Sequence, residues 1–259
     1  MFRKLLQTAR HWPSVWLAQK IEQSAEGRIR CNEVLWCLLE PYIQRSPSTG
    51  VSFSDYGVLY QWIKKYRPRE VLECGTGMST VVIAQALREN FEESGVKGRV
   101  TSMEEYENYH ASAKSLFPRE LDEYAEILFS PAVEDHYHLF RGTRYAEIPD
   151  RKYDFVFVDG PALLSDPKDP NAAINMDFIK LVAKADHPIA ALIDTRTTTC
   201  YVYSLFFPKK FRYDYLRKVG IVLPSTKKDL ASMRDVVFAA MKKHSFRRPP
   251  FGSIISGSY

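Results

Sequence analysis

An acidic residue and two glycines stand where a short apolar segment gives way to a helical one. Residues 69–87 read REVLECGTGMSTVVIAQAL, so that Glu73 precedes Gly75 and Gly77 in the turn. Glycine adopts positive φ readily and lets a ligand approach the main chain without a Cβ in the way. The first turn of the following helix adds N–H groups without intrahelical partners, which favour a bound ligand. We therefore expect a cofactor site made of Glu73, Gly75, Gly77, Ser79 and Thr80.

The charge in this turn indicates the kind of cofactor. A dinucleotide site prefers the pattern GxGxxG, but Thr80 stands where the third glycine belongs. A carboxylate at Glu73 would also repel a pyrophosphate in a cleft of low dielectric constant. Glu73 suits a cation instead, such as a sulfonium or an amino group, directly or through water. The competing interpretation is structural, with Glu73 capping the next helix from the end of its strand.

Three more acids follow or end apolar segments that have the pattern of strands. They are Glu104 after segment 99–103, Asp159 in segment 153–160 and Asp194 at the end of segment 189–194. The carboxyl ends of parallel strands meet at one edge of a sheet, where ligands bind. Asp159 suits a general base, a metal ligand or a loop anchor, and Asp194 suits a second carboxylate or a polar turn. We expect Asp159 and Asp194 to be the catalytic residues, which orient or deprotonate an acceptor.

Other polar groups give weaker indications. His136 and His138 have no third ligand at zinc spacing, so the sequence does not predict a zinc site. Arg196 follows Asp194 closely and suits either an anionic substrate or an ion pair with that acid. Residues 160–174 have the composition of a substrate loop or of an ordinary surface connection.

Strand-like and helix-like segments alternate from residue 54 onward, and several strands are continuously apolar, as in a parallel sheet buried on both faces. The expected helices are 54–67, with a cap at Ser54 or Asp55, 106–117 and 172–185; the expected strands are around 71–72, 99–103, 126–130, 153–160 and 189–194. This order predicts an α/β fold. We expect a Rossmann-like, doubly wound and mostly parallel sheet with an antiparallel edge strand and helices on both faces.

The two ends of the chain differ from this alternating part. We divide the chain into an N-terminal helical extension (1–50), a central domain (51–245) and a C-terminal tail (246–259). Residues 1–22 are apolar at helical spacing with basic residues between them, and Pro13 should interrupt the helix. This extension suits a cap on the domain or a contact in a homodimer, although such a segment can also lie on an anionic membrane. We expect residues 234–243 to form the antiparallel edge strand, with a helix as the alternative.

Composition limits the class of protein. With 259 residues, 45% of them hydrophobic, the chain can bury a large core, and its four cysteines have no metal-ligand spacing. No apolar run reaches the roughly 18 residues of a membrane span, so we expect a cytoplasmic protein that is at most peripheral to a membrane. Residues 208–259 hold twelve Lys or Arg against three Asp, a balance of +9, which leaves −4 for the first 207 residues. Such asymmetry fits an anionic substrate, a membrane surface, nucleic acid or a solvated rim.

The ordered motifs resemble those of class I S-adenosylmethionine-dependent methyltransferases. VLECGTGMST is similar to their first motif, and RVTSMEE is similar to the second, whose strand-end acid binds the ribose. The resemblance gives Glu104 the ribose role, with Glu105 as its competitor, and assigns the adenine pocket to Ala132 and Val133 in EILFSPAVED. YDFVFVDGP and ALIDTR resemble the fourth and fifth strands. The resemblance covers residues 54–199 and implies S-adenosylmethionine as cofactor.

Within that superfamily, LECGTGMSTVVIA with VDGP looks most like the small-molecule and sugar O-methyltransferases. Relatives of that branch often bind Mg²⁺ through acids that end the fourth and fifth strands, which implies Asp159 and Asp194 as metal ligands. Thr195 departs from the family pattern, since a second acid or an amide belongs there. Two carboxylates with water could still hold Mg²⁺. The resemblance implies transfer of a methyl group to a hydroxyl of a small molecule or sugar.

Three other functions remain open from the sequence. The basic C-terminal fifth suits an RNA or protein methyltransferase, although no nucleic-acid module accompanies it. A scaffold that keeps the fold without catalysis would use the two ends of the chain for attachment. An NAD-linked oxidoreductase is disfavoured because the third glycine is missing.

Overall fold

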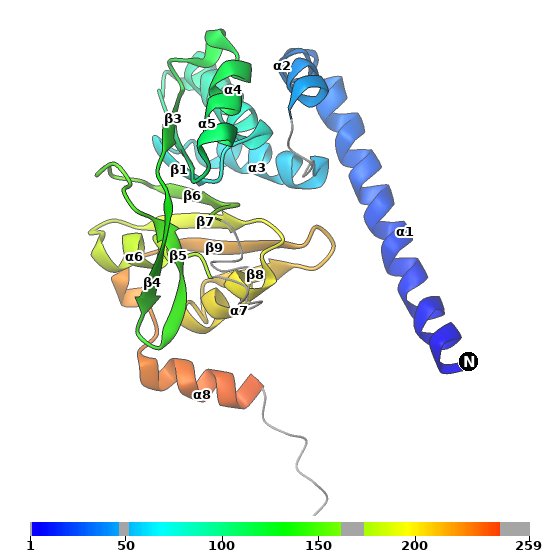
Figure 1. Ribbon diagram of the computed structural model, residues 1–259, viewed down its shortest axis with the longest axis vertical. Coiled ribbons are helices and arrows are strands. Elements are labelled where there is room, and N and C mark those ends of the chain that lie inside the picture. Colours follow the sequence, from blue (N-terminus) through cyan, green and yellow to red (C-terminus); the bar gives the residue numbers. More distant parts are fainter. Residues whose placement is uncertain (1, 47–51, 162–173, 244–259) are drawn as a thin grey trace, which may run out of the picture.

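A seven-stranded sheet forms the centre of the computed structural model, which describes residues 2–46, 52–161 and 174–243 (Figure 1). Strands β3, β2, β1, β6 and β7 are parallel, and β9 pairs antiparallel with β7 and β8, in the order β3-β2-β1-β6-β7-β9-β8. The strands are β1 Glu70–Cys74, β2 Arg99–Glu104, β3 Ala125–Phe129, β6 Phe155–Val158, β7 Ile189–Ile193, β8 Phe211–Asp214 and β9 Val219–Ser225. This topology confirms the expected fold. It places the reversal of strand order between β1 and β6.

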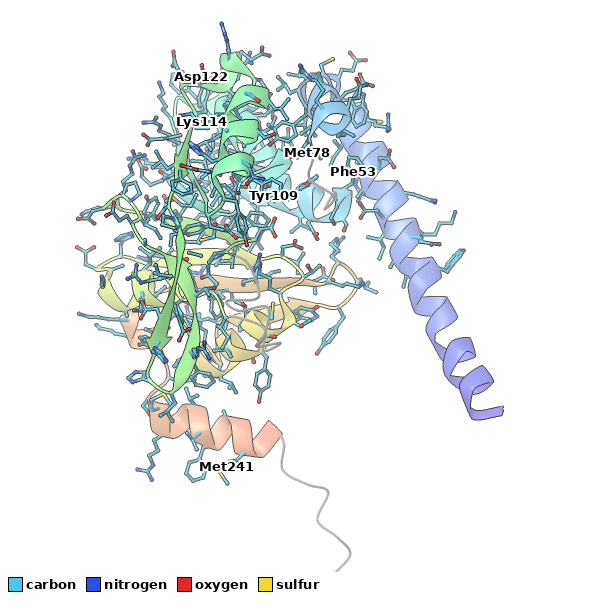
Figure 2. The ribbon with its side chains drawn as sticks, viewed as in Figure 1. Phe53, Met78, Tyr109, Lys114, Asp122 and Met241 are labelled. Atoms are coloured by element: carbon cyan, nitrogen blue, oxygen red, sulfur yellow. The ribbon has the colours of Figure 1, made fainter. Side chains whose placement is uncertain are left out.

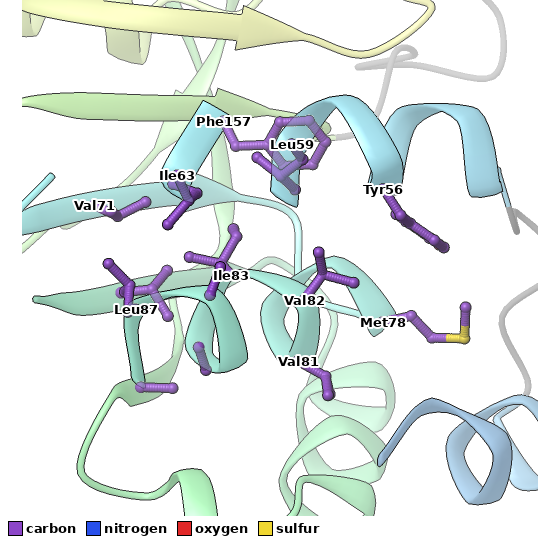
Figure 3. Close-up of a cluster of buried hydrophobic side chains, with 14 of the residues drawn as sticks. Tyr56, Leu59, Ile63, Val71, Met78, Val81, Val82, Ile83, Leu87 and Phe157 are labelled. Carbon is purple, nitrogen blue, oxygen red and sulfur yellow. The ribbon is translucent and has the colours of Figure 1, made fainter. Parts of the chain in front are cut away.

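Helices cover both faces of the sheet and enclose two hydrophobic cores. They are α3 Phe53–Tyr66, α4 Met78–Ser94, α5 Glu107–Leu116, α6 Asp177–Lys184 and α7 Thr197–Phe206. Successive strand residues point to opposite faces, so Val71 joins the core under α3 and α4, while Leu72 joins the core beside α6 and α7. Figure 3 shows Ile63 of α3 and Ile83 of α4 near Val71, and Leu59 of α3 near Phe157. Burial on both faces explains why these strands are continuously apolar.

Two helices precede the sheet, α1 Phe2–Cys31 and α2 Glu33–Arg45. The N-terminal part of α1 stands apart from the rest of the structure (Figure 1), whereas Ala25 and Ile29 near its C-terminal end are buried. The expected interruption at Pro13 is wrong, because α1 is continuous through that position. A proline removes one intrahelical donor, and the helix is retained on both sides of it.

The expected strand over residues 234–243 is also wrong, because this segment forms helix α8 Met233–Lys243. The antiparallel edge is supplied earlier in the chain by β9 and β8, so the sheet has no need of another strand. Val236 is fully buried, but Val237, Phe238 and Met241 are exposed, and Met241 extends from the side of α8 that faces away from the sheet (Figure 2). A segment with one buried apolar position and several helix-forming residues is more stable as a helix.

A β-hairpin that the sequence analysis did not predict follows β3. Strands β4 Ala132–Tyr137 and β5 Phe140–Tyr145 pair antiparallel, and His138 occupies the turn between them with φ of 55°. His136 lies in β4 and His138 lies in the turn, so these two side chains do not project from the same strand. Arg144 and Lys180 both bind the carboxylate of Asp135, which fixes the hairpin to α6.

No helix among the described residues is long and apolar enough to cross a membrane. Most of the expected substrate loop, 160–174, and all of the expected tail, 246–259, lie outside the described residues.

Gly142 should be required for the contact between the hairpin and the segment before α6. A Cβ there would lie 2.1 Å from the carbonyl oxygen of Ile174, while Thr143 N–H donates to the same oxygen at 2.8 Å. We expect Gly142→Ala to lower the free energy of unfolding by about 1–3 kcal/mol in urea titrations, because backbone must shift to admit the methyl group. Gly57→Ala in α3 is the control, because its Cβ meets nothing within 4 Å, and it should be neutral or stabilising. Equal stability of the two variants would contradict this view of the contact.

Candidate active-site cleft

The turn after β1 packs directly on the end of β6. Gly75 has φ of 99°, and a Cβ on it would lie 3.0 Å from the carbonyl carbon of Asp159. Gly160 is equally constrained, because its Cβ would lie 2.7 Å from the nitrogen of Gly75. Gly75 therefore allows protein backbone to approach, and because it also lines a cavity, its expected contact with a cofactor stays a prediction. Gly77 behaves differently, since its Cβ would meet no protein atom within 4 Å although the residue lines a cavity.

Glu73 lies beneath this turn and is fully buried. Its Oε2 accepts a hydrogen bond from the Thr80 hydroxyl at 2.6 Å, and the same hydroxyl accepts the N–H of Gly77 at 3.1 Å. Burial raises the pKa of Glu73 to about 7, against the opposing effect of the Ser102, Ser79 and Thr80 hydroxyls. Glu73 thus fixes the turn from below, and it is not one of the described residues that line the cavity.

The cavity has a volume of about 230 Å³ and lies at the point where strand order reverses. It is bounded by α2, the β1–α4 turn, the end of β2, the first half of α5 and the end of β6. Three carboxylates, those of Glu104, Glu105 and Asp159, line it, and no Lys, Arg or His from the described part of the chain accompanies them. The cleft is therefore electronegative.

Glu104 and Glu105 both contribute to this charge. Glu104 is 6% exposed and accepts the N–H of Tyr106 at 3.0 Å, while Glu105 accepts the Tyr145 hydroxyl at 3.1 Å. Burial, assisted by repulsion from Glu105, raises the pKa of Glu104 to about 7. A carboxylate at the end of β2 with this pKa can accept hydrogen bonds from ligand hydroxyls in neutral solution.

Asp159 and Asp194 follow β6 and β7, as expected, and lie close enough to interact. Desolvation and repulsion from Asp194 raise the pKa of Asp159. Because 45% of the Asp159 side chain remains exposed to solvent, we attribute the raised pKa mainly to the repulsion. Arg196 Nη2 lies 3.9 Å from Asp159 Oδ1 and also donates to the backbone carbonyl of Asp159. The structure thus places Arg196 against Asp159, whereas the sequence suggested Asp194 or a substrate.

A third carboxylate, Asp55 of α3, joins this group and was interpreted only as a helix cap. The cap is Ser52, whose Oγ accepts the N–H of Asp55 at 3.4 Å, so the expected cap at Ser54 or Asp55 is wrong. Asp55 is 4% exposed, and burial with repulsion from Asp194 raises its pKa to about 8. No sequence pattern brings α3 to the end of β7, so only the structure shows this neighbour.

The expected Mg²⁺ site rests on two carboxylates, those of Asp159 and Asp194. Within the described ranges, no three His, Cys, Asp or Glu side chains are placed to hold a metal ion. Thr195, where the family pattern has an acid or amide, is exposed. The metal role of Asp159 and Asp194 therefore stays a prediction.

Comparison with known proteins gives a family match over part of the chain. Residues 72–174 match the family model described as a methyltransferase domain. This part of the chain, less than half of its length, is similar to methyltransferase domains. This match confirms the resemblance that the strand-end motifs indicated, and the matched segment of the methyltransferase domain contains the turn, Glu104 and Asp159.

Solved structures of several O-methyltransferases are similar to this chain at low identity and with TM-scores below 0.5. An O-methyltransferase from Bacillus cereus in complex with S-adenosylhomocysteine is 15% identical over 82% of this chain and 80% of its own, with a TM-score of 0.43. TomG from Streptomyces achromogenes, an O-methyltransferase in complex with S-adenosylmethionine, is 14% identical over 73% and 87%, with a TM-score of 0.46. A putative caffeoyl-CoA O-methyltransferase from Staphylococcus aureus is 16% identical over 86% and 90%, with a TM-score of 0.41. No curated protein sequence matches this chain.

Two residues that the sequence predicts to line the adenine pocket do not line the cavity. Ala132 and Val133 begin β4 and are not among the described residues that line the cavity, so their adenine role stays a prediction. Tyr106 and Tyr109 line it instead, with ring centroids 5.9 Å apart and 48% and 43% of their surfaces exposed. Aromatic residues three apart directly after a strand-end acid are a signal that could have found them.

The Thr80 hydroxyl should stabilise the methyltransferase domain through Glu73. Thr80→Val keeps the side-chain shape but leaves the buried carboxylate without its 2.6 Å donor. We expect a loss of about 1–3 kcal/mol in the free energy of unfolding at pH 8, where Glu73 is ionised. Thr80→Ser, which keeps the hydroxyl, should lose less than half as much. Equal loss in both variants would show that packing, and not the hydrogen bond, is the source.

Proposed function

We propose that the methyltransferase domain transfers the methyl group of S-adenosylmethionine to a hydroxyl of a small molecule or sugar. The observation that carries the proposal is the electronegative cavity at the reversal of strand order, with Gly77 open toward it. Glycine here leaves room for a ligand against the backbone.

The charge of the cleft supports a sulfonium cofactor over a dinucleotide. Two unit charges about 4 Å apart interact by about 4 kcal/mol at an effective dielectric constant of about 20. Glu104, Glu105 and Asp159 would each attract a cation and repel a pyrophosphate. The ionised fraction of these groups therefore favours a sulfonium cofactor over a pyrophosphate.

The residues around the cavity suit the parts of the cofactor. Glu104 would accept hydrogen bonds from the ribose hydroxyls, since its carboxylate lines the cavity at the end of β2. Tyr106 and Tyr109 offer exposed ring faces on which a base can stack. Glu73, Ser79 and Thr80 would act from beneath by holding the glycine turn in place.

Asp159 is the residue that we assign to the methyl acceptor. The cofactor supplies an electrophilic methyl group, so the protein has to orient an acceptor oxygen behind it and take its proton. Asp159 lines the cavity, and a raised pKa makes its carboxylate a better proton acceptor near neutral pH. Asp194 would hold Asp159 in position from β7 and maintain that raised pKa.

The RNA alternative receives no support from the cleft. Its basis was the basic segment after residue 207, and no described residue of that segment lines the cavity. The homodimer contact stays an expectation about the N-terminal extension, and the membrane contact stays one about that extension and the basic residues 208–259.

Calorimetry tests the cofactor assignment. We expect heat with S-adenosylmethionine and S-adenosylhomocysteine and none with NAD. Because ribose hydroxyls favour the ionised form of Glu104, affinity should fall as pH drops through about 7, by about tenfold between pH 8 and pH 6 for one such group.

The matched variant for this test is Glu104→Gln, which should bind more weakly at pH 8 and lose part of the pH dependence. Glu73, with a pKa of about 7, accounts for a remaining slope. Binding of NAD without binding of either sulfur compound would overturn the proposed function.

Asp159→Asn tests the catalytic assignment. Affinity for S-adenosylhomocysteine should change little, whereas kcat should fall by about 10²–10⁴ with an acceptor found by an unbiased methyl-transfer screen, run with and without EDTA. The control is Asp150→Asn, an exposed acid outside the cavity. Full turnover by Asp159→Asn would remove Asp159 from the reaction.

A further inference from the structure

Helix α1 is attached to the rest of the structure near its C-terminal end. The Glu22 carboxylate accepts the backbone N–H of Ser54 at 3.0 Å at the start of α3, and Ala25 and Ile29 are buried. Residues 2–21, which we call the projecting segment, stand apart from the sheet and its helices (Figure 1). At about 1.5 Å per residue, this segment extends about 30 Å beyond its attachment.

Apolar residues of the projecting segment face solvent at its attached end. Trp16 is 60% exposed and Leu17 is 40% exposed. In the sequence, the apolar residues of the segment recur at helical spacing, and they are Phe2, Leu5, Leu6, Ala9, Trp12, Trp16 and Leu17. Helices in proteins gain most of their stability from packing an apolar face. The projecting segment therefore needs a partner other than the domain that it precedes.

The charge of the projecting segment indicates the chemistry of that partner. Its sequence contains four basic residues, Arg3, Lys4, Arg10 and Lys20, and no Asp or Glu. A helix that combines Lys and Arg with Trp, Phe and Leu is typical of helices that lie in the interface of an anionic bilayer. Tryptophan in particular prefers the level of the lipid headgroups, because its ring is apolar and its N–H can reach water.

The same segment of a second copy of the chain is a less suitable partner. In a symmetric dimer one surface meets its own copy, so two segments with four basic residues each would approach one another. The segment contains no acid to compensate this repulsion, whereas negative lipid headgroups do compensate it. Each Lys or Arg close to an anionic membrane raises the affinity by about fivefold.

We propose that the projecting segment is an amphipathic anchor that binds the surface of an anionic lipid bilayer. Trp16 and Leu17 enter the interface, and the basic residues contact the negative groups of the lipids. The contact is peripheral, because no helix in the described part of the chain is long and apolar enough to cross a membrane.

Co-sedimentation of the full-length protein with lipid vesicles tests the proposal. We expect binding to phosphatidylcholine vesicles that contain about one-third phosphatidylserine, and much weaker binding to phosphatidylcholine alone. Affinity should fall as ionic strength rises, because salt screens exposed charges. Trp16→Ser with Leu17→Ser should weaken binding by at least about tenfold, since both side chains lose burial in the interface. Phe91→Ser in α4, where Phe91 is 40% exposed, is the control and should change nothing.

A second pair of variants tests the contribution of charge. Arg10→Gln with Lys20→Gln should weaken binding to the anionic vesicles by at least about tenfold. The matched control is Lys65→Gln with Arg69→Gln, which removes the same charge from exposed positions at the end of α3 and before β1. This control should keep the affinity of the unaltered protein.

Several results would overturn the proposal. They are a lack of binding to the anionic vesicles, equal binding to both kinds of vesicle, and equal losses in a variant and its control. If light scattering finds a dimer that Trp16→Ser with Leu17→Ser converts to a monomer, without vesicle binding, the partner is a second copy. A lower unfolding temperature of this variant would also contradict the proposal, because it would show that these side chains pack within the protein. None of these measurements depends on cofactor binding, so the anchor and the proposed function can fail separately.

Discussion

The contact between the β1–α4 turn and the end of β6 is the constraint on which the rest of the site depends. Two glycines, Gly75 and Gly160, bring backbone against backbone there, closer than any side chain would permit. This contact joins the two halves of the sheet at the reversal of strand order and sets the distance between Gly77 and Asp159. The groups assigned to the cofactor and to the acceptor therefore face each other across a fixed gap.

The burial of acidic residues around this contact lowers the stability of the folded protein in neutral solution. Glu73, Glu104, Asp55 and Asp177 all have pKa values raised to about 7 or 8, chiefly by burial. A carboxyl group with a raised pKa binds its proton more tightly in the folded state, so the stability that it contributes below its unfolded pKa is lost as pH rises through the folded value. A cationic ligand would offset this loss, which links occupation of the cleft to stability in neutral solution.

Local sequence patterns predicted the elements that depend on local physics. The apolar strands, the glycine turn and the acids at strand ends follow from side-chain periodicity and backbone sterics, which act over a few residues. The sequence did not predict that Tyr42 and Asp55 lie at the site, because their positions depend on α2 and α3 packing over the ends of strands far along the chain. The sequence did not predict the β4–β5 hairpin or helix α8 for a related reason. Their pairing and packing depend on which surface the sheet leaves uncovered, and no single segment of the sequence contains that information.

The position of α2 has a consequence for the order in which the protein matures. During synthesis this helix leaves the ribosome before α4 and the strands that support it, so its contacts with α4 cannot form until about fifty further residues have been made. Helix α2 is thus the first part of the cleft to be synthesised, and it can complete the cleft only when the later elements are present. A nascent chain acquires a complete cleft only after β6 has been added, and an amino-terminal fusion that delays the docking of α2 would delay the appearance of ligand binding without altering the sheet.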